Sequence, residues 1–188
     1  MIKYIEKTKE YVQITGYRNL KINDSKEFVK KIRENTAKDV WIQFFDASVV
    51  ATWQHLFFAI LNAQLRFKNQ RNISKSIEME TLLYASTQHQ IKKAIKNIGV
   101  KNESSDVAII LVAKNIERIN SALLSISKKI KSKPDEKVLE FSDYKQDRIR
   151  NVFEIKQNEI GAVMKENNIR NSIRDIILEK MALLSTKF

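Results

Sequence analysis

The run of eight residues from Asp106 to Ala113, DVAIILVA, constrains the fold more than any other part of this 188-residue chain. It is the most apolar stretch of the sequence, and it is too short for most helices. Successive side chains of a strand point to opposite faces, so a strand that is apolar throughout must be covered on both faces. We therefore expect an inner strand of a sheet that helices cover.

Two further segments predict strands of the same sheet. Residues 11–17, YVQITGY, alternate apolar and polar side chains, a pattern typical of a half-buried strand, and we expect an edge position for them. Residues 40–45, VWIQFF, carry apolar side chains at both odd and even positions, which favours a central strand. Together these patterns predict a mixed β-sheet of about four strands.

Apolar side chains that recur every three to four residues predict helices in most of the remaining chain. The expected helices cover residues 25–34, 48–67, 77–85, 91–98, 115–131, 144–163 and 168–184. In the fourth of them, Ile91, Ala94, Ile95 and Ile98 share one face, which we expect to pack on the core. The order of strands and helices predicts a helix-rich α/β or α+β fold.

The length of the chain fits a single domain that spans residues 1–188. Residues 128–143 hold the only proline and a dense set of charges, which indicates a charged loop or arm. The apolar side chains of the terminal helix, at about 168–185, indicate a docking helix for this domain or for a partner.

Residue counts narrow the classes of function. The 34 lysines and arginines outnumber the 22 acidic residues by twelve, an excess that attracts polyanions such as nucleic acid. Two histidines and no cysteine argue against a metal site, and three glycines are too few for a phosphate-binding loop or a nucleotide cofactor. The lack of cysteine and of a long apolar run predicts a cytoplasmic protein with no membrane partner.

A narrow polar stripe runs along the otherwise apolar helix 48–67. Its members are His55, Asn62 and Arg66, whose spacing places them on one side of the helix. The stripe leads towards Lys68 and Arg71 in the loop that follows. Such a stripe and loop are candidates for binding an anion.

The loop leads into the helix 77–85, whose first turn carries Glu78 and Glu80. Side chains two residues apart on a helix point about 200° apart, which argues against an acid–base pair. Carboxylates near a helix N-terminus stabilise the helix. We therefore expect a structural role for both, with one of them holding the loop lysine.

A longer motif between Thr52 and Gly99 resembles a known family. It comprises His55-Leu56, Ala59, Asn62-Ala63, NISKSIEME at 72–80, LLYAS at 82–86, QIKKAI at 90–95 and Gly99. In this order the residues closely resemble the kinase-binding subunit of the KEOPS complex, of the CGI-121 type, also called the PRPK-binding or TPRKB-like proteins.

The resemblance implies a non-catalytic subunit of a heteromeric complex, without cofactor or metal. Such a subunit binds the small atypical kinase-like ATPase of KEOPS and recruits tRNA through its 3′ CCA end for threonylcarbamoyl-adenosine modification. The residues then expected to bind tRNA are His55, Asn62, Arg66, Lys68, Arg71, Asn72, Ser74, Lys75 and Lys92. Those expected to bind the kinase-like subunit are Ile173, Ile176, Ile177, Lys180, Leu184, Lys187 and Phe188.

Two other functions stay open at this point, a stand-alone small RNA-modifying enzyme and a general RNA-binding chaperone. An enzyme requires His55 and either Glu78 or Glu80 to lie within hydrogen-bond reach of one substrate. A carboxylate engaged in a cap or a lysine pair would remove that basis. RNA binding that ignored the CCA end would favour the chaperone.

Overall fold

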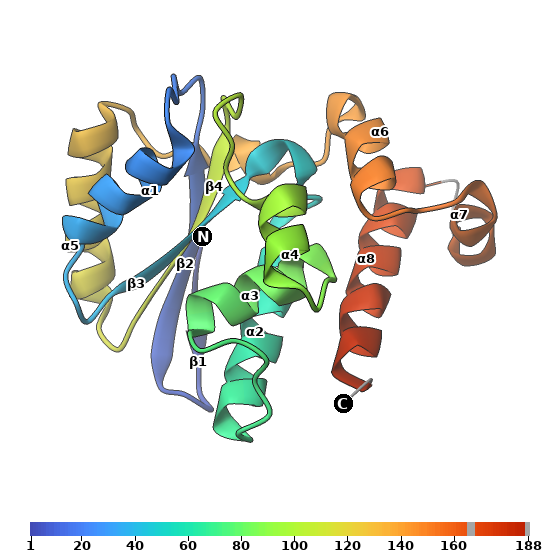
Figure 1. Cartoon of the computed structure of the whole chain (residues 1–188), viewed down its shortest axis with the longest axis horizontal. Helices are drawn as coiled ribbons and strands as arrows, with labels where there is room; N and C mark the ends of the chain where they lie inside the picture. Colours follow the sequence, from blue (N-terminus) through green and yellow to red (C-terminus); the bar gives the residue numbers. More distant parts are fainter. Residues whose placement is uncertain (165–167, 187–188) are drawn as a thin grey trace. The chain divides into compact units, whose positions relative to one another are not determined.

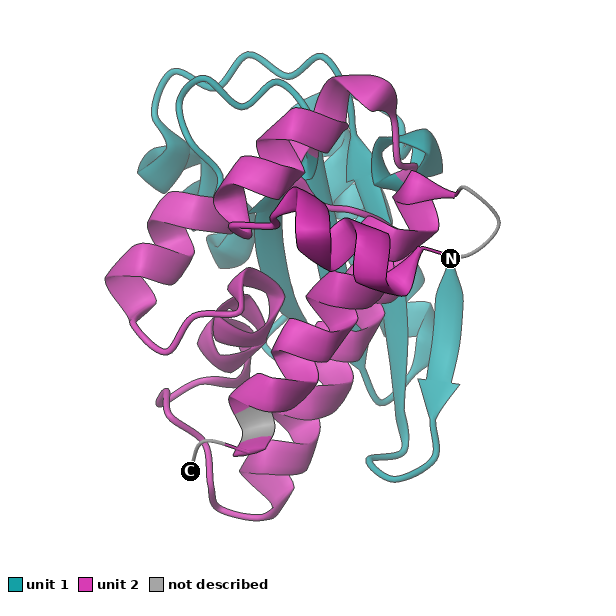
Figure 2. Ribbon diagram, turned by 90° about the vertical axis from the view of Figure 1, so that its right-hand side faces the viewer, with its two compact units in different colours: residues 1–47, 100–139 teal, residues 48–99, 140–188 magenta. Residues whose placement is uncertain are grey.

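The computed structural model describes residues 1–164 and 168–186. The chain forms two compact units, coloured separately in Figure 2. Unit 1 contains residues 1–47 and 100–139, and unit 2 contains residues 48–99 and 140–188. Each unit is therefore built from two separate stretches of the chain, and a short 3-10 turn, Ala47–Val49, lies where the chain passes from the first unit to the second.

Unit 1 is built on a four-stranded sheet with the order β1-β2-β4-β3. The strands are β1 (Ile2–Ile5), β2 (Glu10–Tyr17), β3 (Trp41–Asp46) and β4 (Val107–Ala113). Every neighbouring pair is antiparallel. Because β4 is paired on both sides and apolar at every position, it forms the centre of the sheet.

Two helices of unit 1, α1 (Ser25–Glu34) and α5 (Ile116–Ile130), cover the same face of this sheet (Figure 1). Each begins at a polar side chain that accepts hydrogen bonds from the first turn: Asp24 caps α1, and Asn115 caps α5. Alternate residues of β3 and β4 meet these helices in one core cluster. Its members are Tyr17, Ile22, Ile32, Val40, Ile42, Phe44, Val107, Ile109, Leu111, Ala113, Ile119, Ala122 and Ile126.

The α+β class and the inner strand at 107–113 are confirmed, and all seven residues of β4 are buried. The expected strand positions were wrong in two places, because β2 is an inner strand and β3 lies at an edge. Apolar side chains at both odd and even positions indicate that both faces of a strand are covered. They carry no information about which strands pair with its backbone. The sheet is also wholly antiparallel, where a mixed sheet was expected.

Gly16 in β2 allows a close approach within unit 1. A Cβ atom at this position would lie 2.2 Å from Cγ2 of Val138 and 2.5 Å from the carbonyl oxygen of Val107. Val138 belongs to a 3-10 turn, Glu136–Leu139, that packs on β2. The end of the charged stretch predicted as a loop or arm is thus seated on the sheet, through Val138 and Leu139, which are both buried.

Unit 2 consists of helices. They are α2 (Trp53–Lys68), α3 (Ile77–Ser86), α4 (Ile91–Ile98), α6 (Asp143–Val152), α7 (Gln157–Val163) and α8 (Ile169–Thr186). Helix α2 packs on α3 and α8, α3 packs on α4 and α8, and α7 packs on α8. None of the described helices is long and apolar enough to cross a membrane.

Two expectations for unit 2 differ from the structure. The helix predicted over 144–163 is split into α6 and α7, because Glu154 adopts a left-handed backbone conformation with a φ of 52°. On α4, Ile91 and Ile95 are 41% and 46% exposed, and the buried apolar residues are Ala94 and Ile98. Helix α4 therefore packs through one edge of its apolar arc.

Candidate nucleic-acid interface

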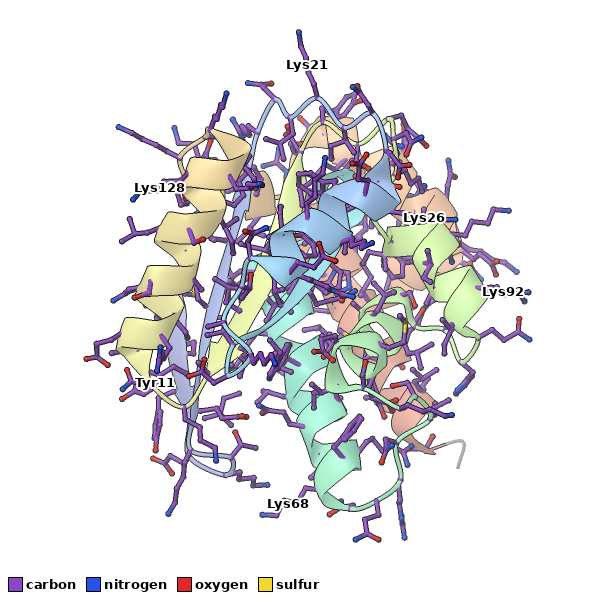
Figure 3. The ribbon with its side chains drawn as sticks, turned by 60° about the vertical axis from the view of Figure 1, so that its left-hand side comes forward. Tyr11, Lys21, Lys26, Lys68, Lys92 and Lys128 are labelled. Atoms are coloured by element: carbon purple, nitrogen blue, oxygen red, sulfur yellow. The ribbon has the colours of Figure 1, made fainter. Side chains whose placement is uncertain are left out.

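The loop between α2 and α3, residues 69–76, presents positive charge on the surface of unit 2. Lys68 at the end of α2, and Arg71 and Lys75 in the loop, are exposed, and Figure 3 shows Lys68 extending outward from α2. The loop contains no carboxylate. Asn72 is also exposed, and the apolar side chain of Ile73 is 40% exposed beside it. We call residues 68–76 the basic loop.

Glu80 of α3 holds the basic loop in place. Its Oε2 accepts hydrogen bonds from the backbone N–H of Ser74 at 2.8 Å and of Ile73 at 3.0 Å, and its side chain is fully buried. A buried carboxylate needs such donors, because burying an unpaired charge is costly. The structural role expected for this carboxylate is observed, with the loop backbone as its partner in place of a lysine.

Further hydrogen bonds fix the loop from within. The hydroxyl of Ser74 donates to the carbonyl of Ser76 at 2.7 Å, and the side-chain amide of Asn72 donates to the carbonyl of Ser74 at 2.9 Å. Ser76 in turn caps α3 by accepting from the backbone N–H of Met79. Because Ser74 is only 3% exposed, it shapes the loop from inside and offers little surface to a ligand.

Two members of the polar stripe of α2, His55 and Arg66, bond to α3 and are buried. Arg66 is 6% exposed, and its Nε donates to the hydroxyl of Tyr84 at 2.8 Å. Asn62 is half-buried and donates to the carbonyl of Phe58 at 2.8 Å. Arg66, expected from the sequence to contact RNA, is therefore a packed residue that supports the end of α2, where its carbonyl accepts from the backbone N–H of Arg71.

His55 is fully buried, and both of its hydrogen-bond partners belong to unit 2. Its Nδ1 accepts from the backbone N–H of Ala51 at 3.3 Å, so the proton lies on Nε2, which donates to the carbonyl of Ala85 at 2.7 Å. Desolvation by burial lowers the pKa of His55 from 6.5 to about 4, against the opposite effect of the Ala85 bond. His55 is thus a neutral core residue, and the expectation of a direct RNA contact is corrected.

These contacts also bear on the enzyme alternative. Both ring nitrogens of His55 and both oxygens of Glu80 are engaged by backbone groups. No group of three or more potential metal ligands exists among residues 1–164 and 168–186. The enzyme alternative requires His55 with either Glu78 or Glu80, and of these His55 and Glu80 are already held by backbone groups.

Lys92, the remaining residue expected to bind tRNA, lies on α4. Its side chain is exposed, and in Figure 3 it projects well away from Lys68. The structure thus brings Lys68, Arg71, Asn72 and Lys75 together on the basic loop and leaves Lys92 outside it.

The residues expected to bind a kinase are mostly buried. Ile173, Ile176, Ile177 and Leu184 are at most 5% exposed, because α8 uses its apolar face to pack within unit 2. These four side chains therefore offer almost no surface for the direct contact with a kinase that was expected of them. Lys180 bonds to the Glu159 carboxylate and to the carbonyl of Phe153, each at 3.2 Å. Lys187 and Phe188 lie outside the described residues.

A pocket of about 330 Å³ lies in unit 2 beside the same helix. It is bounded by the turn after α3, the end of α6 and the last turns of α8. Its lining includes Gln88, His89, Phe153, Lys180, Leu183 and Leu184, of which Leu183 is 50% exposed. Local sequence patterns do not indicate this pocket, because its walls come from three segments that are far apart along the chain.

The fold and the basic loop define a small α+β protein whose surface is suited to an anionic partner. The family model described as kinase binding protein CGI-121 matches residues 17–185. A regulatory protein named Cgi121 from Methanocaldococcus jannaschii is 34% identical over 145 residues, which cover 77% of this chain and 83% of that relative. The chain belongs to the CGI-121 family of kinase-binding proteins, and membership implies a kinase partner.

Proposed function

We propose that this protein is the non-catalytic subunit of a KEOPS complex in the cytoplasm. In this role it binds the atypical kinase-like ATPase subunit and recruits tRNA through its 3′ CCA end for threonylcarbamoyl-adenosine modification. Family membership supports the kinase partner, and the motif between Thr52 and Gly99 supports the complex.

The observation that carries the tRNA part is the basic loop and its attachment to Glu80. Single-stranded RNA ends are held by cations that meet phosphates and by side chains that meet unstacked bases. The loop offers both, with Lys68, Arg71 and Lys75 as cations and Asn72 and Ile73 between them. Because Glu80 fixes the backbone at residues 73 and 74, little ordering of the loop is needed on binding.

The buried residues expected to bind tRNA act through the loop in this proposal. The backbone carbonyl of Arg66 accepts a hydrogen bond from the backbone N–H of Arg71. The Ser74 hydroxyl fixes the turn by its bond to the Ser76 carbonyl, and His55 joins α2 to α3. Lys92 is not part of the site for the CCA end. Arg71 and Lys75 are therefore the residues whose charge should matter most.

For the kinase-like subunit, we place docking at the pocket beside the last turns of α8. Exposed Leu183 offers an apolar contact at its rim, and Lys180, which is held by Glu159 and the Phe153 carbonyl, forms part of its wall. The buried isoleucines of α8 hold the helix in place, and the contact expected for Lys187 and Phe188 stays part of the proposal.

The test of the tRNA part is a pair of charge reversals, Arg71→Glu with Lys75→Glu, in the full chain. Binding of intact tRNA should weaken at least tenfold, and binding of tRNA trimmed of its CCA end should change much less. Lys92→Glu with Lys93→Glu is the matched control, since it alters net charge equally on α4. Equal losses for both RNAs, or equal losses in both variants, would remove the basic loop from the proposed site.

A further inference from the structure

Unit 1 carries a dense cluster of lysines at the end of α5 and in the segment that follows. Within residues 128–137 the exposed lysines are Lys128, Lys129, Lys131, Lys133 and Lys137. Figure 3 shows Lys128 extending from α5 into solvent. We call residues 128–137 the lysine segment.

The two acidic residues of the lysine segment are engaged by cations from elsewhere in unit 1. Asp135 forms an ion pair with Nε of Arg18 at 3.3 Å, and Glu136 forms one with the terminal ammonium of Met1. Within the part of the chain that the structure describes, no lysine of the segment has an ion-pair partner. The segment therefore presents five exposed lysines without an ion-pair partner among the described residues, while its two carboxylates are each paired with a cation outside the segment.

The backbone of the lysine segment is held at several points. The backbone N–H of Ser132 donates to the carbonyl of Ser127, and that of Asp135 donates to the carbonyl of Gly16 at 2.8 Å. Val138 then packs on Gly16 and is 1% exposed. The lysines thus extend from a backbone that the sheet keeps in position.

Helix stability accounts for only part of this cluster. Lysines in a last helical turn interact favourably with the helix dipole, which explains Lys128 and Lys129. Lys133 and Lys137 lie beyond the helix and gain nothing from it. Exposed lysines of α1 show the usual arrangement, since Lys31 pairs with Glu27 at 2.6 Å and Lys30 with Glu34 at 3.8 Å, four residues away.

We infer that the lysine segment is a second RNA contact, which binds backbone phosphates without reading sequence. The segment has no arginine and no aromatic residue, so it lacks the planar groups that hydrogen-bond to bases or stack on them. Lysine ammonium groups suit phosphates, which fix an RNA in place but carry no sequence information. This inference rests on the proposed function, because that function supplies tRNA as the polyanion.

The test is the salt dependence of tRNA binding by the full chain. In one variant Lys128, Lys129, Lys131 and Lys133 are changed to Gln, and in the matched control Lys7, Lys21, Lys26 and Lys38 are changed to Gln. Each lysine that neutralises a phosphate contributes about 0.7 to 0.9 to the slope of log K against log salt. The segment variant should lose about 3 from this slope with intact and with trimmed tRNA, and bind at least tenfold more weakly at 0.1 M salt.

A slope loss equal to that of the control variant would overturn the inference. A third variant with Arg at the same four positions should keep the wild-type slope, which separates loss of charge from loss of folding. Unchanged tRNA binding together with lost binding to phosphatidylserine vesicles would also overturn it. Failure of the proposed function would appear separately, as equal binding of intact and trimmed tRNA by the wild-type chain.

Discussion

The carboxylate of Glu80 accepts a hydrogen bond from the backbone N–H of Ser74 at 2.8 Å, and this bond connects the basic loop to helix α3. The same carboxylate accepts the N–H of Ile73. One buried side chain thus determines the conformation of the segment that carries Arg71 and Lys75. The cations of the loop and the group that positions them are different residues, so their contributions can be measured separately.

Glu80→Gln should weaken tRNA binding although every cation of the loop remains. The amide places an N–H group opposite one of the backbone N–H groups, and an unsatisfied buried donor costs about 1 to 3 kcal/mol. We expect this loss in the free energy of unfolding, measured with urea, and a loss of affinity for intact tRNA. Glu78→Gln is the control, since Glu78 lies in the same helical turn without bonding to the loop. Wild-type tRNA affinity in Glu80→Gln would contradict the positioning role.

His55 should make the stability of the protein depend on pH. Its pKa is about 4 in the folded state and 6.5 in the unfolded chain, so the unfolded chain binds more protons between these values. The contribution of His55 to the free energy of unfolding should therefore be fully present above pH 6.5. It should fall by about 1.4 kcal/mol per pH unit as the pH is lowered towards 4, a loss of about 3 kcal/mol in all.

The measurement is the free energy of unfolding from pH 4 to 7 in the wild type, in His55→Asn and in His89→Asn. Asn at position 55 does not titrate, so the slope assigned to His55 should disappear in that variant. His89→Asn is the control and should keep the slope. Carboxylates also titrate in this range, such as Glu159, whose pKa is lowered chiefly by the hydrogen bond from the Lys156 backbone. Their contributions are the same in all three proteins, so they cancel when the curves are compared. Parallel curves would show that burial of His55 does not govern the acid response.

Much of the fold could be predicted because the responsible patterns are local. The bounds of α1 follow from Asp24 and the apolar residues after it, and β4 follows from an unbroken apolar run. Strand β1 was missed because three of its four residues are exposed, which leaves no burial pattern to read. The positions of β2 and β3 within the sheet depend on pairing with β4, which side-chain patterns do not encode.

The candidate site could be predicted only in part, again because only local patterns can be read from the sequence. Arg71 and Lys75 are exposed loop cations, as their polar surroundings in the sequence indicate. His55 and Arg66 were expected to bind tRNA because they form part of a polar stripe on an otherwise apolar helix. They are buried because Ala85 and Tyr84, about 20 to 30 residues further along, supply hydrogen-bond partners. A single sequence does not show which buried polar groups will find such partners.

Gly16→Ala should destabilise the protein, since the added Cβ would meet both Val138 and the carbonyl oxygen of Val107. The second of these atoms belongs to the sheet backbone and has little freedom to move. Overpacking of this kind costs about 1 to 3 kcal/mol, which thermal or urea unfolding would detect. Gly161→Ala is the matched control, because nothing lies within 4 Å of its added Cβ and alanine favours a helix by up to about 1 kcal/mol. Equal effects of the two substitutions would contradict the close packing at Gly16.

Leu183→Arg should weaken kinase binding without unfolding the protein. Leu183 is half exposed at the rim of the pocket, so arginine there can remain in solvent and still disturb an apolar contact. Ile177→Arg provides the contrast, because Ile177 is fully buried and a charge there should unfold unit 2. Calorimetry with the kinase-like ATPase and circular dichroism would separate the two effects. Unchanged affinity of Leu183→Arg for the kinase would place docking elsewhere.

The central claim is that one protein holds the kinase-like ATPase and the CCA end of tRNA together. The most direct measurement is a pull-down with the tagged full chain, the kinase-like ATPase, and either intact tRNA or tRNA trimmed of its CCA end. We predict that the kinase is retained in every case and that intact tRNA is retained with it at least tenfold better than trimmed tRNA. Equal retention of the two RNAs, or displacement of tRNA by the kinase, would contradict the claim.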